Sequence, residues 1–243
     1  MNVRIVKDGI DVIRQGLRIY AGKHPPLFYN LYGFCGLRHD FCVRSVSPET
    51  ELVIEGFPRS ANTFAVVAFV QAQRQGVRIA HHLHAPAQVI RAAHWQIPTL
   101  VLIREPKNTI LSQVIRKPQS SIAQALSSYI SFYEAIIEYR DAYVVGTFQE
   151  VTKEYGTVIE KVNAKFGTHF FPFDHTDTNL REVFTTIETL NVLHGEGVED
   201  QVSRPSVGKE KSKYELENAL QAKKVRALLS VAEAIYRDFS LSG

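Results

Sequence analysis

The sequence predicts a three-layer α/β fold in which a central parallel sheet is flanked by helices on both faces. From residue 51 onward, short apolar runs alternate with longer helical segments, the order expected of parallel strands joined by crossover helices. The apolar runs are continuous, as in strands buried on both sides. Polar and glycine-containing segments follow these runs at their carboxyl ends, where ligands bind in such sheets.

The elements are predicted from apolar runs, helical spacing and prolines near helix starts. The expected strands are 52–54, 77–80, 99–103 and 143–145. The expected helices are 3–20, 62–74, 86–94, one from residue 106, 119–140, 153–166, 178–193 and 213–239. Residues 24–50 are rich in proline, glycine and aromatics and are predicted to be irregular.

The length of 243 residues fits one α/β domain that spans 1–243. Within it, we expect an N-terminal helix and irregular segment over 1–50 and a nucleotide-binding core over 51–166. A helical C-terminal part follows over 167–243. The basic, turn-forming stretch 203–211 is predicted to be a solvated loop or a lid over an anionic ligand.

Composition excludes several classes of protein. Hydrophobic residues make up 45% and charged residues 22%, which is ordinary for a globular protein, and the net charge of +3 is too small to indicate a nucleic-acid partner. No apolar stretch approaches the roughly 20 residues of a membrane span, and the N-terminus lacks a signal core, so we expect a cytoplasmic protein. Helix 3–20 is expected to pack on the domain; the alternative is peripheral association with a membrane surface. Cys35 and Cys42 are expected to be free thiols.

A phosphate-binding loop is predicted directly after the first strand. Against the pattern G-x-x-x-x-G-K-[ST], Gly56 and Thr63 occupy the first and last positions, while Ala61 replaces the second glycine and Asn62 the lysine. A strand–loop–helix unit holds phosphate through backbone N–H groups and the helix N-terminus, and Ser60 and Thr63 add hydroxyl donors. The alternative is a tight strand-to-helix turn without a ligand.

The sequence lacks the lysine of this pattern, and it also lacks the carboxylate that would bind magnesium. Nucleotide hydrolases place a carboxylate at the end of a neighbouring strand, whereas strand 99–103 ends in Arg104. The sequence therefore disfavours ATP or GTP hydrolysis and predicts a donor whose phosphates are held by protein groups alone, without metal.

A second constellation runs from Arg104 to Ser112. It lies at the end of a strand and enters a helix near Pro106, which places Ser112 on the second helical turn. An arginine and a serine that converge there suit a terminal phosphate monoester, because the guanidinium binds it in a fork geometry.

Taken together, the two segments resemble the sulfotransferases that use 3′-phosphoadenosine 5′-phosphosulfate (PAPS). The family loop P-K/R-S-G-T-T-W is similar to P-R-S-A-N-T-F over 58–64, and the family motif R-x-P/A-K-D-x-x-x-S matches at Arg104, Pro106, Lys107 and Ser112. The two motifs have the family's order and approximate separation, and the resemblance covers about 51–166.

The resemblance implies a donor site for PAPS and for its product PAP. Arg59 would stabilise charge on the oxygen that leaves sulfur, and Phe148 stands where the family often has a tyrosine near the adenine. Arg204 and Lys209 would close over the donor. The implied donor-binding residues are Arg59, Ser60, Ala61, Asn62, Thr63, Phe64, Arg104, Ser112, Phe148, Arg204 and Lys209.

Three histidines, His81, His82 and His84, follow the second strand, where the family commonly has its catalytic base. A group that titrates near neutral pH suits removal of the proton from an acceptor hydroxyl. Spacing favours His82, with His84 as the alternative. Clustered histidines also suggest zinc, but no cysteine or carboxylate with ligand spacing follows closely.

The sequence thus predicts a transferase that moves a sulfuryl group from PAPS to a hydroxyl of a glycan, a lipid or a small alcohol or phenol. Two alternatives stay open: a small-molecule kinase with a P-loop fold, and a non-catalytic nucleotide-binding relative. Ala61 and Phe148 are the features that favour the second alternative.

Overall fold

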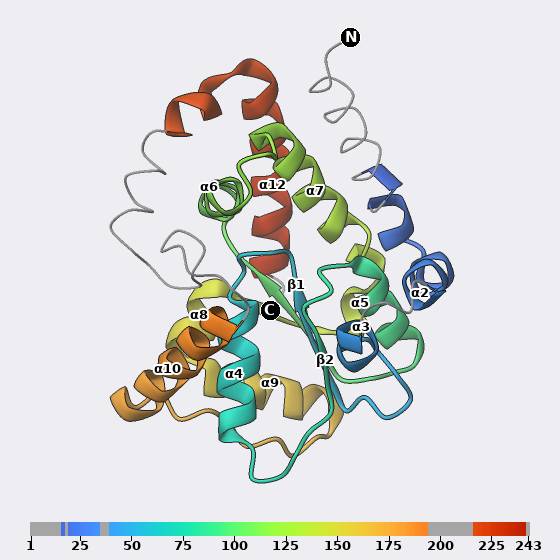
Figure 1. Cartoon of the computed structure of the whole chain (residues 1–243), viewed down its shortest axis with the longest axis vertical. Coiled ribbons are helices and arrows are strands. Elements are labelled where there is room, and N and C mark those ends of the chain that lie inside the picture. Colours follow the sequence, from blue (N-terminus) through green and yellow to red (C-terminus); the bar gives the residue numbers. More distant parts are fainter. Residues whose placement is uncertain (1–15, 18, 35–38, 194–215, 242–243) are drawn as a thin grey trace.

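The centre of the computed structural model is a four-stranded parallel sheet (Figure 1). The structure describes residues 16–17, 19–34, 39–193 and 216–241. The strand order is β2-β1-β3-β4, so β1 and β3 lie in the middle. The strands are β1 (Leu52–Gly56), β2 (Ile79–His81), β3 (Thr99–Ile103) and β4 (Val144–Thr147).

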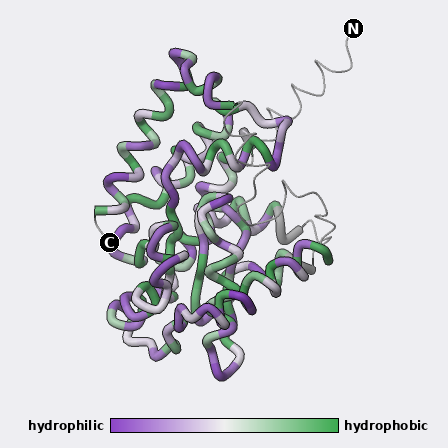
Figure 2. The backbone as a smooth tube through the Cα atoms, turned by 90° about the vertical axis from the view of Figure 1, so that its left-hand side faces the viewer, coloured by the Kyte–Doolittle hydropathy of each residue, from purple (hydrophilic) through white to green (hydrophobic). Residues whose placement is uncertain are grey.

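Helices cover both faces of this sheet, which confirms the predicted α/β fold class. Along β3, Leu100 and Leu102 belong to one apolar core and Val101 and Ile103 to the other, and none of the four is exposed. This division follows from the two-residue period of a strand. The two central strands consist mainly of apolar residues. Hydrophilic and hydrophobic residues alternate along the helical turns of the tube in Figure 2.

Two groups of helices form the outer layers. Residues of α4 (Asn62–Ala72), α9 (Tyr155–Phe166) and α10 (Asp177–Leu193) pack on the face that includes Leu100, and α8 (Phe148–Lys153) adds Val151 there. The core on the opposite face is built with the helices α5 (Pro86–His94), α6 (Pro106–Arg116), α7 (Ile122–Glu134) and α12 (Lys223–Leu241).

The strand and helix positions predicted from the sequence hold in the described core, with shifted boundaries. The helix expected over 119–140 is α7 followed by a 3₁₀ helix, η1 (Ile137–Ala142), and α7 begins at a capping box formed by Ser121 and Gln124. The last helix is divided into the 3₁₀ helix η3 (Asn218–Gln221) and α12.

One prediction is wrong: residues 24–50 are not irregular throughout. They contain α2 (Pro25–Phe34) and α3 (His39–Arg44). Phe28 is buried against Ala85 and Ala87 at the start of α5, so tertiary packing stabilises helices that the local proline and glycine content disfavours. Cys42 is a free, exposed thiol.

None of the helices in the described ranges is long and apolar enough to cross a membrane. The predicted helix 3–20 falls mostly outside the described residues, as does Cys35. The stretch 203–211, with Arg204 and Lys209, also lies outside them.

Candidate functional site

The candidate site lies along the carboxyl edge of the sheet, where the segments that follow the four strands meet. Because all strands are parallel, the loop after β1, the histidines after β2, Arg104 after β3 and Phe148 after β4 come to this same edge. This is where ligands bind in open α/β sheets.

The loop between β1 and α4 has a strained backbone. Arg59 and Ala61 have φ angles of 73° and 69°, in the left-handed region that side chains other than glycine rarely adopt. The Asn62 Nδ2 donates to the Phe57 carbonyl across 3.0 Å and closes the loop. Strain of this kind concentrates at functional sites.

The interior of this loop contains unsatisfied polar groups. The Ser60 Oγ and the Asn62 Oδ1 are both buried, and neither makes a hydrogen bond of standard geometry within the described residues, although Ser60 lies near the Tyr133 hydroxyl. Buried polar atoms without partners are rare in folded proteins. A ligand with polar oxygens, such as a phosphate, would give the Ser60 hydroxyl an acceptor.

The start of the loop is fixed to the neighbouring strand by a buried tyrosine. The Tyr133 hydroxyl donates to the Leu102 carbonyl at 2.8 Å and accepts from the Phe57 amide at 3.4 Å. Burial raises the pKa of Tyr133 well above its ordinary value, so its hydroxyl stays protonated and keeps donating. α7, which carries Tyr133, thus holds the ends of β1 and β3 in register.

The structure brings the two sequence motifs into contact. The Arg59 Nε donates to the Ser112 Oγ at 2.9 Å, and an Arg104 guanidinium nitrogen donates to the Arg59 carbonyl at 3.2 Å. The Arg104 guanidinium also lies 4.0 Å from the centre of the Phe148 ring, and the Tyr129 hydroxyl fixes the Arg104 carbonyl at 2.9 Å. Two arginines, a serine and an aromatic ring from four segments therefore form one cationic cluster.

A pocket of about 300 Å³ opens beside this cluster, between α6, α8 and α12. Arg104 and Phe148 form part of its wall, and Lys153 adds a second cation. Its volume is at the lower end of the range of small-molecule sites. The lining residues are Arg104, Glu105, Asn108, Phe148, Gln149, Thr152, Lys153 and Tyr236.

Phe64 lies elsewhere. It is 7% exposed and packs among Tyr155, Phe173, His175 and Phe184, in the core between α4 and α10. The donor-binding role that the resemblance implies for Phe64 stays a prediction.

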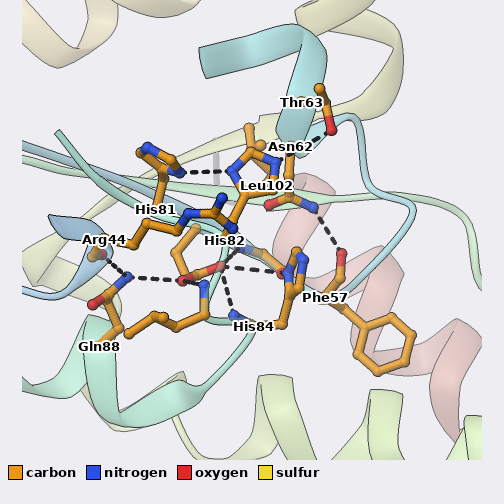
Figure 3. A network of polar contacts seen from close by, with 12 residues as sticks. Arg44, Phe57, Asn62, Thr63, His81, His82, His84, Gln88 and Leu102 are labelled. Carbon is orange, nitrogen blue, oxygen red and sulfur yellow. Dashed lines mark hydrogen bonds and ion pairs between the residues drawn. The ribbon is translucent and has the colours of Figure 1, made fainter. Parts of the chain in front are cut away.

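The three histidines at and after the end of β2 lie along the loop between β1 and α4. The His82 Nε2 lies 3.2 Å from the Thr63 Oγ1, on the first turn of α4, and the Nδ1 atoms of His81 and His82 are 2.8 Å apart (Figure 3). The His84 Nδ1 contacts the Gly56 carbonyl at 2.8 Å. His82 therefore lies by the loop's helical end, whereas His84 faces the end of β1.

Burial and neighbouring cations keep His82 neutral. Desolvation lowers the pKa of His82 well below its ordinary value, and His84, His81, Arg44 and Arg116 lower it further. The pKa of His81 falls to about 4, again through burial first and Arg44 second. A neutral imidazole can accept a proton, so the arrangement is compatible with a base at His82.

The sequence analysis missed Glu55, a carboxylate with no exposed surface at the end of β1. It accepts hydrogen bonds from the backbone amides of Leu83 (3.0 Å) and His84 (3.1 Å), from the Gly56 amide (3.2 Å) and from the Gln88 Nε2 (3.0 Å). The His84 Nδ1 is 3.5 Å away. A charged residue inside an apolar strand was the signal available in the sequence.

Glu55 holds the histidine loop in an unusual conformation. His82 and His84 have φ angles of 57° and 51°, and Glu55 accepts from the amides on both sides of Leu83 and from Gln88. Desolvation raises the pKa of Glu55 to about 7, although its hydrogen bonds act in the opposite direction. Glu55 thus connects the start of the loop between β1 and α4 with the backbone of the histidine segment.

Within the described ranges, no group of three His, Cys, Asp or Glu side chains is arranged to hold a metal ion. Of the candidate residues, the structure groups Arg59, Arg104, Ser112 and Phe148 on one side of the loop and His82 and Thr63 on the other.

The described fold is an α/β fold with a strand–loop–helix unit at the carboxyl edge of a parallel sheet. No protein-family model matches the chain, and no curated protein matches it in sequence. Among solved structures, the chain is similar to mouse sulfotransferase SULT7A1 complexed with PAP, with 14% identity and a TM-score of 0.44 over 77% of this chain and 91% of that one. This likeness is distant, and the function proposed below rests on the site itself.

Proposed function

We propose that this chain is a sulfotransferase that moves a sulfuryl group from PAPS to an acceptor hydroxyl. The observation that carries the proposal is the meeting of the two motifs: Arg59 of the loop contacts Ser112, and Arg104 contacts the loop backbone. These segments lie more than 40 residues apart in the sequence. A neutral histidine lies at the opposite end of the same loop.

The donor would lie across the loop and the cationic cluster. Arg104 and Ser112 would bind the 3′-phosphate, and Ser60, Ala61, Asn62 and Thr63 the 5′-phosphate. The buried Ser60 hydroxyl fits this role, because it makes no hydrogen bond of standard geometry within the described residues and a phosphate oxygen would supply an acceptor. We expect the adenosine near Phe148, in the pocket beside Arg104. Phe64, Arg204 and Lys209 keep the donor-binding roles that the resemblance implies as predictions.

The proposed reaction is an in-line attack on sulfur. The acceptor oxygen forms the new bond to sulfur as His82 takes its proton, and the bond between sulfur and the 5′-phosphate oxygen breaks. Arg59 stabilises the charge that develops on that oxygen, which becomes part of PAP. Since His82 is neutral and within 3.2 Å of Thr63, it lies next to the loop that would hold the donor. His84 remains the alternative base.

A small-molecule kinase is the second candidate, and the site disfavours it. A kinase needs a carboxylate for magnesium near the phosphates. The buried carboxylate nearest the loop is Glu55, whose two oxygens already accept from Gly56, Leu83, His84 and Gln88. A non-catalytic nucleotide-binding relative is the third candidate, and it would show nucleotide affinity without turnover.

The class of acceptor and the cellular location of the protein stay predictions. A glycan, a lipid and a small alcohol or phenol are acceptor classes that the proposal includes. A cytoplasmic location is an expectation from the sequence, and peripheral membrane association through helix 3–20 is the alternative to its packing on the domain.

Isothermal titration with PAP in the absence of magnesium tests the proposal. We expect micromolar binding to the wild type and a loss of about tenfold to a hundredfold in Arg104→Ala, since hydrogen bonds between charged groups contribute about 1.5–3 kcal/mol. Arg181→Gln, an exposed arginine on α10, is the matched control. Absence of PAP binding together with magnesium-dependent binding of ATP would contradict the proposal and favour the kinase.

A further inference from the structure

His81 and His82 are consecutive residues whose rings are in direct contact. The Nδ1 atoms of the two rings are 2.8 Å apart, and the ring planes are nearly perpendicular, at 86° (Figure 3). At this distance one Nδ1 carries a proton and donates it to the lone pair of the other. The contact therefore couples the tautomer of one ring to that of its neighbour.

The backbone is turned so that this contact can form. Consecutive side chains of a strand point to opposite faces of the sheet. His81 ends β2 and pairs with β1, whereas His82 has a φ of 57°, in the left-handed region that carries strain outside glycine. Glu55 accepts from the next two backbone amides, those of Leu83 and His84, and so stabilises the turn that places the two rings side by side.

The second ring nitrogen of His82 faces the loop between β1 and α4. Its Nε2 lies 3.2 Å from the Thr63 Oγ1. Because burial keeps the ring neutral, His82 has one ring proton for two partners. Either Nδ1 carries this proton and Nε2 accepts from the Thr63 hydroxyl, or Nε2 carries it and donates to that hydroxyl.

Only the first of these tautomers lets His82 act as a base toward the loop. A proton on Nδ1 leaves the lone pair on Nε2, the nitrogen on the side of the proposed donor site. In histidines that act as bases, the tautomer is set by the hydrogen bond that the other ring nitrogen makes. For His82, the group at that position is the Nδ1 of His81.

We propose that His81 is a positioning residue for the base: its Nδ1 accepts from the Nδ1–H of His82 and thereby keeps the lone pair of His82 on Nε2, toward the acceptor hydroxyl. The inference rests on the proposed function, in which His82 is the base. Burial, with Arg44 acting in the same direction, lowers the pKa of His81 to about 4. Near neutral pH the His81 ring is therefore neutral, with its own proton on Nε2 and a lone pair on Nδ1.

The same hydrogen bond contributes when the proton moves. The acceptor oxygen loses its proton, the Nε2 of His82 gains it, and His81 keeps the proton that it has. His82 is then an imidazolium, and its bond to His81 becomes charge-assisted and stronger. His81 thus stabilises the protonated form of His82 more than the neutral form, which offsets part of the desolvation that opposes this proton.

Nitrogen-15 NMR of the full chain, labelled at its histidine rings, tests this inference near neutral pH without donor or acceptor. In the wild type we expect the ring proton of His82 on Nδ1 and that of His81 on Nε2; the His82 signals are identified by their loss in His82→Gln. His81→Phe retains an aromatic ring without an acceptor, so the Nδ1 tautomer of His82 should no longer dominate. His81→Asn offers a side-chain oxygen as acceptor and should retain that tautomer. His169→Phe, at an exposed position, is the matched control and should leave it unchanged.

Sulfuryl transfer from PAPS to 4-nitrophenol supplies a second readout. We expect His81→Phe to lower the turnover number by about tenfold to a hundredfold, the range that a buried donor left without an acceptor costs. The affinity for PAP should stay within about twofold, because His81 contacts the base and not the donor site. His81→Asn should recover most of the turnover, and His169→Phe should equal the wild type.

Two results would overturn the inference while leaving the donor site intact. One is a wild-type His82 whose ring proton lies on Nε2, a result that needs no variant to fold. The other is a His82 tautomer that stays the same in a His81→Phe variant that binds PAP like the wild type. Failure of the wild type to bind PAP would instead contradict the proposed function, and the two failures are distinguishable because the tautomer is measured without a nucleotide.

Discussion

The loop between β1 and α4, which we propose binds phosphate, has two sides that are built in different ways. On the proposed donor side, direct contacts join segments that end strands or begin helices. These contacts link Arg59, Arg104, Ser112 and Phe148. On the proposed base side, Glu55 holds the segment that contains the histidines by accepting from the backbone amides of Leu83 and His84. The proposed donor side therefore depends on contacts among side chains that would face the donor, whereas the proposed base side depends on the buried Glu55.

The comparison predicts that removing a group on the base side impairs catalysis without impairing donor binding. We expect His82→Ala to lower the turnover number by about 10²-fold to 10⁴-fold, the contribution typical of a general base. PAP affinity should stay within about twofold, because His82 lies at the Thr63 end of the loop and away from Arg104. Steady-state kinetics with titration calorimetry measure both quantities.

His84→Ala is the matched variant for this prediction. His84 contacts the Gly56 carbonyl and Glu55 rather than Thr63, so its loss should reduce turnover less than the loss of His82. A larger loss of turnover in His84→Ala, with His82→Ala nearly active, would contradict this prediction and assign the role of general base to His84.

Glu55 should make stability depend on pH. Its pKa is raised from 4.5 to about 7, so the contribution of its protonated form is complete below pH 4.5 and is lost as pH rises through 7. The full loss amounts to about 3 kcal/mol, at 1.36 kcal/mol for each pH unit. Glu55→Gln removes this titration, so the wild type should lose stability relative to the variant between pH 4.5 and 8.

Urea denaturation at several pH values measures this difference. Glu160→Gln, at an exposed position on α9, serves as the control and should follow the wild type. A constant difference between the wild type and Glu55→Gln across this range would show that Glu55 stays ionised in the folded protein.

A substitution at Gly56 tests how closely β1 approaches β3 at the start of the loop. A Cβ atom at this position would lie 2.4 Å from the Leu102 carbonyl oxygen, a backbone atom that cannot move aside alone. We expect Gly56→Ala to lower the free energy of unfolding by about 2–3 kcal/mol, as overpacking typically does. Gly76→Ala meets no atom within 4 Å and should change stability little. Similar denaturation midpoints for the two variants would contradict this account.

Substitution of Ala61 should have the smallest effect on the free energy of unfolding. Its φ of 69° costs an alanine about 1 kcal/mol, which glycine largely avoids. Ala61→Gly should therefore stabilise the fold by up to about 1 kcal/mol, reduced by the entropy that glycine loses on folding. Thermal denaturation detects this change, and a destabilised variant would show that the methyl group has packing contacts that outweigh the strain.

The difference between the two sides also explains what the sequence could predict. The strands, the loop and Arg104 could be placed because each depends on local spacing or on an apolar run that marks a strand. The contact between Arg59 and Ser112 follows once those strands are parallel neighbours. The sheet edge thus brings together residues that the two motifs and their resemblance to the sulfotransferase family had already indicated.

The base side could not be predicted in the same way. Glu55 and Gln88 are joined across 33 residues, and Arg44 joins them from a segment predicted to be irregular. That segment contains α2, whose Phe28 is buried against the start of α5, and α3, whose Phe41 packs on the same cluster, and no local pattern reveals this packing. The position of Phe64 is likewise decided by the aromatic cluster under α10.

The most direct test of the central claim compares PAP with adenosine 5′-phosphate, which lacks the 3′-phosphate, in the wild type and in Arg104→Ala. We predict that the wild type binds PAP about tenfold to a hundredfold more tightly than adenosine 5′-phosphate, because this is the affinity that hydrogen bonds between charged groups typically contribute. We also predict that Arg104→Ala removes most of this preference. Equal binding of the two nucleotides by the wild type, or a preference unchanged in Arg104→Ala, would contradict the assignment of this edge of the sheet as a PAPS site.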